Sequence, residues 1–296
     1  MLPVSRFVQH LKTVVSTALG RNPAGRALTV FPDDIFLVSY FRSGSTWSRF
    51  LVGNLVQQDE PINFANVERL VPLIYELPDR VLRRSRRILK SHECFDPRYP
   101  RVVYIVRDPR DVAVSFYFYN LKVRVIPDGY PMDDFVRRWV AAKVVGYADL
   151  VGCWQDHVLS WVRLRSGHPG FRLVRYEDLL ADPVKELTAL APFLGVEPDP
   201  DRIQRAVDLS SGSHMQSLEK EQSQKWVTTK GTRSDIAFVR EAKAGGWRKK
   251  LSPTAVRIIE DAWGPTLQEF GYELAASSEP LAATPSATAA GSSSGR

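Results

Sequence analysis

Short apolar runs of strand type alternate with amphipathic helical stretches along most of this chain. Four runs are apolar enough to form strands buried on both faces, at 35–40, 87–92, 101–106 and 171–176. Stretches with helical periodicity lie between or after these runs, at 46–57, 109–119, 133–165 and 182–193. Because strands and helices alternate, the sequence predicts an α/β fold with a central parallel sheet flanked by helices.

The charge of the chain favours anionic ligands. Lys and Arg together number 40 against 33 Asp and Glu, so the formal net charge is +7. Nucleic acid, acidic lipid and phosphorylated metabolites all suit a basic protein, so charge alone does not choose among them. The two cysteines, Cys94 and Cys153, have no metal-type spacing, which excludes a disulfide framework and favours a reducing, cytoplasmic location.

Composition divides the chain into three parts. Residues 275–296 are mainly Ala, Ser, Thr, Pro and Gly, which bury too little apolar surface to offset ordering, so we expect a disordered tail. Residues 26–274 then form one domain. Residues 1–25 are basic and form an N-terminal helix or extension, either packed on the domain or in weak contact with a membrane surface. No apolar run approaches the roughly 20 residues of a membrane-spanning helix.

The stretch FLVSYFRSGSTWSRFLV, residues 36–52, reads as a strand, a polar loop and a helix, similar in outline to a P-loop. Its polar part would place backbone N–H groups, hydroxyls and a guanidinium at a helix N-terminus, which is an anion site by geometry and by dipole. Gly44 lets the backbone curl close to a ligand. The alternative is an ordinary turn in which Ser45 or Thr46 caps the helix.

Polar residues also follow other predicted strands. Arg107 ends the strand at 101–106, and Asp108 and Pro109 then open a helix that carries Ser115 about two turns further on. A functional Arg107 would face an anion, whereas the alternative makes it the ion-pair partner of Asp108 or Asp111.

Lys90 and His92 alternate at the end of another predicted strand, so both point to one face. The ordinary pKa of histidine, roughly 6.5, suits a general base near neutrality. The basic stretch 238–252 has poor periodicity and contains a Gly-Gly turn. It is therefore a loop, either a solvated face or a flap that closes over phosphate.

Together these stretches resemble the sulfotransferases that use 3′-phosphoadenosine 5′-phosphosulfate (PAPS) as donor. Residues 40–47 are similar to the family's 5′-phosphosulfate loop YPKSGTTW, and residues 107–115 resemble its 3′-phosphate motif. Further similarities follow in the family's order, to KSH at 90–92, GSWxxHVxxW at 152–161, YEDL at 176–179 and RKGxxGDWK at 240–248. The resemblance spans roughly residues 30–272.

The resemblance implies transfer of a sulfuryl group from PAPS to a hydroxyl or amine of a small molecule, lipid, natural product or sugar, with no metal. It makes His92 the general base, with Lys90, Arg42 and Ser115 as the other catalytic residues. Ser45 and Thr46 would hold the 5′-phosphate. The full donor-binding set that it implies is Arg42, Ser43, Gly44, Ser45, Thr46, Trp47, Arg107, Ser115, Tyr176, Ser210, Arg240, Glu241 and Ala242. Of these, three would hold the 3′-phosphate, namely Arg107, Ser115 and Arg240, and two would flank the adenine, namely Trp47 and Tyr176.

The chain departs from the family pattern at several positions. Arg42 stands where the family has lysine, which keeps the charge and adds a planar fork of donors. Gly212 replaces an aromatic residue of SFxxM and removes one stacking face for adenine. Glu241 and Ala242 replace the Lys-Gly of RKG, with the loss of one positive charge. We expect residues 117–131 to wall the acceptor cleft and the basic stretch 238–252 to cover it.

Two other functions stay open from the residues alone. A small-molecule kinase would need an unusual phosphate loop, because the lysine spacing of a P-loop is missing. A nucleic-acid-binding protein could use RVLRRSRR at 80–87, which has five arginines in eight residues. A solvated connection is the simpler interpretation of that stretch, so we expect no nucleic-acid partner. A homodimer is left open.

Overall fold

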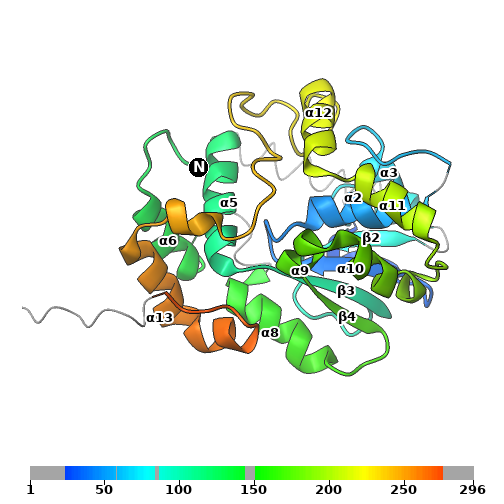
Figure 1. Ribbon diagram of the computed structural model, residues 1–296, viewed down its shortest axis with the longest axis horizontal. Helices are drawn as coiled ribbons and strands as arrows, with labels where there is room; N and C mark the ends of the chain where they lie inside the picture. Colours follow the sequence, from blue (N-terminus) through cyan, green and yellow to red (C-terminus); the bar gives the residue numbers. More distant parts are fainter. Residues whose placement is uncertain (1–23, 58, 84–86, 144–150, 276–296) are drawn as a thin grey trace, which may run out of the picture.

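The computed structural model describes residues 24–57, 59–83, 87–143 and 151–275. At its centre lies a parallel sheet of four strands in the order β2-β1-β3-β4 (Figure 1). The strands are β1 (Ile35–Ser39), β2 (Ile88–Ser91), β3 (Arg101–Val106) and β4 (Phe171–Arg175). All four predicted strands are present, and the predicted α/β fold with a central parallel sheet is confirmed.

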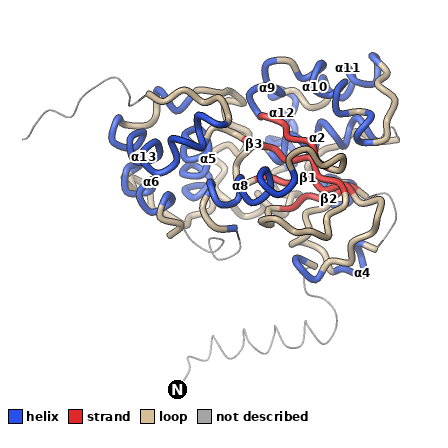
Figure 2. Tube along the Cα trace, turned by 90° about the horizontal axis from the view of Figure 1, so that it is seen from below, coloured by secondary structure: helices blue, strands red, loops and turns tan. Residues whose placement is uncertain are grey.

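Alternate residues of the strands face two different sets of helices. Phe36 and Val38 of β1 contribute to one core, which includes residues of α5 (Pro109–Lys122), α6 (Met132–Val140), α8 (Trp154–Arg165) and α13 (Pro253–Glu269). Ile35 and Leu37 contribute to the other core, with residues of α2 (Ser45–Val56), α9 (Tyr176–Ala181), α10 (Pro183–Leu190) and α11 (Pro200–Asp208). Figure 2 shows α5, α6 and α13 grouped at one end of the sheet and α9, α10 and α11 grouped apart from them. The sheet is thus the middle layer of three.

The predicted helix at 133–165 is not continuous in the described residues. The stretch 133–165 forms α6 and α8, with an interruption between them. Ala142 and Gly152 both adopt left-handed backbone conformations, with φ of 53° and 64°, which a continuous right-handed helix does not accommodate. Cys153 then caps α8, its Sγ accepting a hydrogen bond from the amide of Asp156 at 3.4 Å. The stretch 182–193 likewise ends its helix at Leu190, before the 3₁₀ turn η2 (Pro192–Leu194).

The two edges of the sheet differ. In β4 the side chains of Arg172 and Leu173 are exposed, so the prediction of burial on both faces is wrong for this strand. Strand β2 is buried along its length because the segment before α4 adds to its edge. The amide of Lys90 donates to the oxygen of Pro72 at 2.8 Å, and the amide of Ile74 donates to the oxygen of Lys90 at 3.1 Å. Residues 72–74 are therefore fixed beside the end of β2.

The remaining elements are short and lie around the sheet: η1 (Gly25–Ala27), α3 (Val67–Leu70), α4 (Asp79–Leu82), α12 (Gly212–Gln222) and η3 (Gly246–Lys249). The predicted loop at 238–252 is irregular apart from η3. None of the helices in the described ranges is both long and apolar enough to cross a membrane. The predicted N-terminal extension and C-terminal tail lie outside the described residues, except for residues 24, 25 and 275.

The arginine-rich stretch 80–87 contributes to the fold through ion pairs. Arg87 is buried and donates two hydrogen bonds to the carboxylate of Asp34, at 2.7 and 2.8 Å. Arg83 pairs with Asp79 at 2.8 Å on the surface. Arg87 is therefore unavailable to a phosphate backbone, which weakens the nucleic-acid interpretation.

Candidate active site

A cavity of about 920 Å³ opens where the strands of the sheet end. Residues directly after β1, β2, β3 and β4 line it, as expected for the carboxyl edge of a parallel sheet in which β2 and β3 flank β1 on opposite sides. Most of the predicted site residues line this cavity: Arg42, Gly44, Ser45, Thr46, Trp47, Lys90, His92, Arg107, Ser115, Tyr176, Arg240, Glu241 and Ala242. The structure thus brings together motifs that lie up to 200 residues apart, from 42 to 242.

The N-terminus of α2 opens toward the cavity without a side-chain cap. Gly44 occupies the cap position with φ 94°, and neither Ser45 nor Thr46 caps the helix. A Cβ atom on Gly44 would lie 2.4 Å from the ring of Tyr176, so only glycine fits there. The ordinary-turn alternative for this loop is therefore wrong, and the amide groups of the first turn remain available to an anion.

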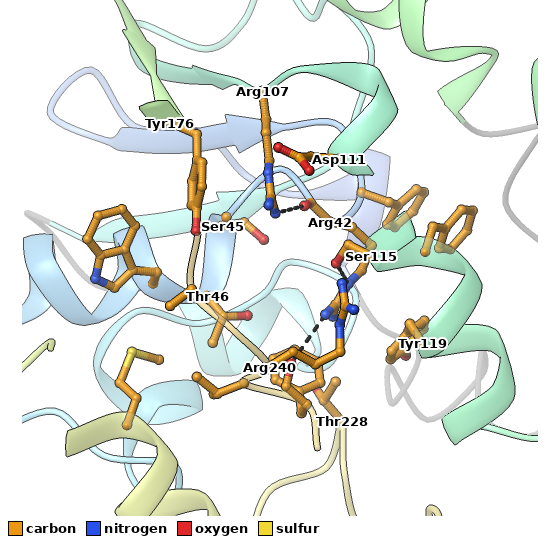
Figure 3. A pocket seen from close by; sticks show the side chains of 18 of the residues that line it. Arg42, Ser45, Thr46, Arg107, Asp111, Ser115, Tyr119, Tyr176, Thr228 and Arg240 are labelled. Carbon is orange, nitrogen blue, oxygen red and sulfur yellow. Dashed lines mark hydrogen bonds between the residues drawn. The ribbon is translucent and has the colours of Figure 1, made fainter. Parts of the chain in front are cut away.

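The side chain of Arg42 crosses the cavity to α5. Its Nε donates to the hydroxyl of Ser115 at 3.1 Å. Its guanidinium lies 4.4 Å from the ring centroid of Phe238 and 4.9 Å from that of Tyr119 (Figure 3). Burial lowers the pKa of Arg42 to about 10, and Arg240 contributes to that lowering. The loop of β1 is thereby connected to α5 and to the basic loop by one side chain.

Arg107 extends from the end of β3 along the ring of Tyr176, with 4.2 Å between the guanidinium and the ring centroid (Figure 3). It donates to the main-chain oxygen of Arg42 at 3.3 Å. Asp108 pairs instead with Arg110, at 2.8 Å. Within the described residues Arg107 forms no ion pair, so the alternative pairing with Asp108 or Asp111 is not realised and its charge faces the cavity.

The basic loop lies over the cavity and is held to α5 by one carboxylate. Asp111 accepts hydrogen bonds from the amides of Gly245 at 2.6 Å and Trp247 at 2.9 Å. Arg240 faces inward and lies 4.6 Å from the ring of Phe118. Burial lowers the pKa of Arg240, and the neighbouring Arg107 lowers it further. Since like charges converge here, the arrangement favours the flap interpretation and complements a multiply charged anion.

His92 lies at the end of β2 with a fixed ring orientation. Its Nδ1 is 2.7 Å from the main-chain oxygen of Ser39. Because a carbonyl oxygen only accepts, Nδ1 carries the hydrogen, and Nε2 keeps a lone pair. Burial lowers the pKa of His92 well below 6.5, and the charge of Lys90 adds to this effect. The imidazole is therefore neutral and able to accept a proton at neutral pH.

Lys90 and His92 line the same cavity, as their alternation predicts. Burial lowers the pKa of Lys90 to about 7; Arg49 lowers it further, and Glu68 opposes the change. Arg49 itself is fully buried and bonded to Glu68 and to the oxygen of Val71, the latter at 2.8 Å. The charge of Lys90 is thus sensitive to any anion that binds near it.

Two side chains of α8 hold the chain where it leaves β2. His157 contacts the main-chain oxygen of His92 through Nε2 at 3.0 Å, and Trp161 donates to that of Glu93 at 2.8 Å. The hydroxyl of Tyr104 lies 2.8 Å from Nδ1 of His157. Burial lowers the pKa of His157 to about 4, so this ring is neutral. The motif at 152–161 therefore supports the backbone of His92.

Two predicted donor residues lie behind the cavity wall instead of lining it. Ser210 is fully buried: its hydroxyl accepts from the side chain of Asn54 at 3.2 Å, and its oxygen accepts from the indole N–H of Trp47 at 2.8 Å. Ser210 therefore orients Trp47. Ser43 is also fully buried.

Gly212 stands where the family motif SFxxM has an aromatic residue, and its small size allows the basic loop to pack closely against it. A Cβ atom on Gly212 would lie 3.1 Å from the Cβ of Ala242. A large aromatic side chain at Gly212 would therefore press against Ala242, and the two small residues belong together. Trp47 and Tyr176 remain as aromatic walls, with ring centroids 5.5 Å apart.

The expected acceptor wall is mostly wrong. Of the stretch 117–131, only Tyr119 lines the cavity. Instead Leu73, Tyr75 and Glu76 supply a wall beside His92, from the segment that is paired to the edge of β2. Phe41 completes it, with its ring centroid 4.4 Å from that of His92. No local pattern in residues 71–76 could have assigned them to the site.

Comparisons with known proteins agree with this geometry. A model of the sulfotransferase domain matches residues 32–271. Sulfotransferase 1A1 of Bos taurus is 25% identical over 275 residues, 87% of this chain and 91% of that protein. Sulfotransferase 1B1 of Mus musculus is 28% identical over 241 residues, 75% of this chain and 79% of that protein.

Solved structures show the same fold. Mouse sulfotransferase SULT7A1, crystallised in a complex with PAP (adenosine 3′,5′-bisphosphate), has a TM-score of 0.64 and 23% sequence identity to this chain. The similarity covers 82% of this chain and 87% of that one. Since the family model spans most of the chain, from β1 to α13, this protein belongs to the sulfotransferase family and is a sulfotransferase.

Proposed function

We propose that this sulfotransferase moves the sulfuryl group of PAPS to a hydroxyl of a small-molecule acceptor, with His92 as general base. One observation carries this proposal. The cavity joins a neutral histidine, whose Nε2 has a free lone pair, to an uncapped helix N-terminus and a group of inward-facing guanidinium groups. The first suits proton removal, and the others suit a donor with several negative charges.

The residues present fit the donor. The first turn of α2, with the space that Gly44 leaves beside Tyr176, suits the 5′-phosphosulfate. Arg107 and Arg240, whose charges converge, suit the 3′-phosphate together with Ser115. Bound there, PAPS supplies an activated sulfuryl group, and the protein supplies its position and charge neutralisation.

The chemical step that we propose needs two side chains at the reacting atoms. His92 accepts the hydroxyl proton at Nε2 while the acceptor oxygen bonds to sulfur. Lys90 offsets the negative charge on the phosphate oxygen whose bond to sulfur breaks. We assign Arg42 to the donor site and not to the reacting atoms, because its guanidinium contacts Ser115 and Phe238.

The walls beside His92 favour an acceptor with a flat apolar part. Phe41 and Phe116 stack with ring centroids 6.2 Å apart, and Tyr75 also lines the cavity. Such rings favour aromatic or aliphatic alcohols over a highly hydrated sugar.

Cys94 and Cys153 are free thiols, which supports our proposal of a cytoplasmic location.

Labelled PAPS with a series of phenols and alcohols tests the proposed reaction, with sulfation read by mass. His92→Ala should lower turnover by roughly 10²–10⁴, the usual contribution of a positioned general base, and leave donor affinity almost unchanged. Independence from metal stays a prediction, so EDTA should leave turnover unchanged. Full turnover in His92→Ala would mean that another group accepts the proton.

A thermal shift experiment tests donor recognition separately. Adenosine 3′,5′-bisphosphate (PAP) should raise the melting temperature, because it binds the native state alone. AMP lacks the 3′-phosphate and should raise it much less. Equal shifts from the two nucleotides would remove Arg107, Ser115 and Arg240 from their proposed role.

A further inference from the structure

The acceptor side of the cavity contains a carboxylate from a rigid segment. Glu76 lines the cavity two residues after Ile74, which is bonded to the backbone of β2. Its own amide donates to the oxygen of Leu73 at 3.0 Å, and Leu73 forms a bridge with Lys90. Backbone bonds on both sides of this turn hold Glu76 near the end of the strand that carries Lys90.

Glu76 differs from the other carboxylates that line the cavity. Asp111 accepts two amide hydrogen bonds, and Glu241 pairs with Lys250 at 2.6 Å. In the described part of the chain, the carboxylate of Glu76 has neither a hydrogen bond nor an ion pair. Glu76 is an exposed residue that lines the cavity, so it lies at the mouth of the cavity. Partial burial still raises its pKa, and Glu68 adds to this, whereas Lys90 and Arg49 oppose it. An unpartnered carboxylate in a cavity wall is a free acceptor for a ligand's donor group.

The surroundings of Glu76 define what such a ligand looks like. Tyr75 and Phe41 also line the cavity, and the Phe41 ring lies beside His92. His92 is buried whereas Glu76 is exposed, so His92 lies deeper in the cavity than Glu76. Two cations, Lys90 and Arg49, act on both Glu76 and His92. Arg49 is already paired with Glu68, and the pKa of about 7 leaves Lys90 only partly charged at neutral pH. The wall therefore changes from apolar to anionic along its length.

We propose that Glu76 selects acceptors that carry a protonated amine, so that the preferred substrates are aromatic alcohols or phenols with an ammonium group. The hydroxyl of such an acceptor faces His92, its ring lies along Phe41 and Tyr75, and its ammonium group pairs with Glu76. This inference rests on the proposed function, because it assigns a substrate class to the same site.

Three phenols of similar size but different charge test the inference: tyramine (cation), 4-ethylphenol (neutral) and 3-(4-hydroxyphenyl)propanoate (anion). The wild type should prefer tyramine to 4-ethylphenol in kcat/KM by about two- to fivefold, the effect of a solvent-exposed ion pair. Glu76→Gln should lose this preference, so that the ratio of its kcat/KM for tyramine to that for 4-ethylphenol falls to about one. Glu76→Lys should instead favour the anion.

The control is Glu197→Gln, which removes an exposed carboxylate that does not line the cavity. It should keep the tyramine preference. Two results would overturn the inference: a wild type that does not discriminate by charge, or a Glu76→Gln enzyme that still prefers tyramine. An equal loss of rate with all three phenols would also overturn it, because Glu76 would then act only through Lys90.

The failure of this inference is distinct from failure of the proposed function. If the wild type sulfated none of the three phenols, the proposed function would be in question. Calorimetric binding of tyramine and 4-ethylphenol to the protein with PAP would still decide the role of Glu76. Tighter binding of tyramine that Glu76→Gln abolishes supports it, and equal binding of the two phenols overturns it.

Discussion

The Nε2 atom of His157 lies 3.0 Å from the main-chain oxygen of His92. Because that oxygen only accepts, Nε2 carries the hydrogen, and Nδ1 of His157 must accept from the hydroxyl of Tyr104. His92 in turn donates from Nδ1 to Ser39. The proposed base is therefore held through its backbone by α8 and through its ring by β1.

We expect His157→Ala to lower kcat by about tenfold, because loss of a buried hydrogen bond costs about 1–3 kcal/mol and here releases the backbone of the base. The KM for PAPS should change little. Tyr104→Phe is the matched control: it disturbs the same buried group but keeps the bond to His92. Steady-state kinetics measure kcat and the KM for PAPS in both variants. Equal kcat values in both variants would show that His157 contributes only stability.

Arg107→Ala should weaken the binding of PAP by about 1.5–3 kcal/mol, the range for a hydrogen bond to a charged group. Arg172→Ala removes another arginine that contacts an aromatic ring, with 5.1 Å to the centroid of Phe193, but lies outside the cavity. Its affinity for PAP should equal that of the wild type. Titration calorimetry measures both, and unchanged affinity in Arg107→Ala would exclude this residue from the donor site.

Gly44→Ala should damage the donor site more than it damages the fold. The new methyl group would meet the ring of Tyr176 at 2.4 Å and would also strain a backbone with φ 94°. Gly167→Ala shares the strain, at φ 76°, but nothing lies within 4 Å of the added atom. Both should lose about 1–2 kcal/mol of unfolding free energy from the backbone. Only Gly44→Ala should lose PAP affinity as well, by at least about tenfold in Kd.

The pH dependence of kcat/KM for PAPS should show two limbs. In the proposed mechanism activity requires neutral His92, whose pKa lies well below 6.5, so the rate should already be high at pH 6.5. Activity also requires protonated Lys90, so the rate should fall as the pH rises through about 7. The kcat profile should stay level to higher pH, because the negative charge of the bound donor raises the pKa of Lys90.

Lys90→Arg gives the control for that profile, because a guanidinium keeps its charge through the alkaline range. The alkaline fall in kcat/KM should disappear in this variant, whatever its absolute rate. A fall that persists at the same pH would assign the limb to a group other than Lys90.

Sequence reasoning identified much of the cavity lining because these residues lie at or just after the carboxyl ends of strands. Arg42, Lys90 and Arg107 belong to three neighbouring parallel strands, and the carboxyl ends of such strands meet at one edge. The direction of the Arg42 side chain was not predictable. It depends on a left-handed φ of 62° and on Phe238, which lies 196 residues away in the chain.

The acceptor side depends on contacts that no local pattern records. Leu73 and Glu76 reach the site because their segment pairs with the edge of β2, and neither lies in a recognisable motif. Tyr117, assigned to the acceptor wall from its sequence position, instead contacts Phe135, with ring centroids 5.4 Å apart. Tertiary pairing thus decides which aromatic residues face the acceptor.

The pairing of residues 72–74 with β2 also covers the edge of the sheet next to Lys90. A free parallel edge next to Lys90 would offer unpaired N–H and C=O groups to a strand from another molecule. The amide and oxygen of Lys90 are both taken up by Pro72 and Ile74. Substitutions that loosen this segment should therefore promote aggregation, because they would expose that edge to strands of other molecules.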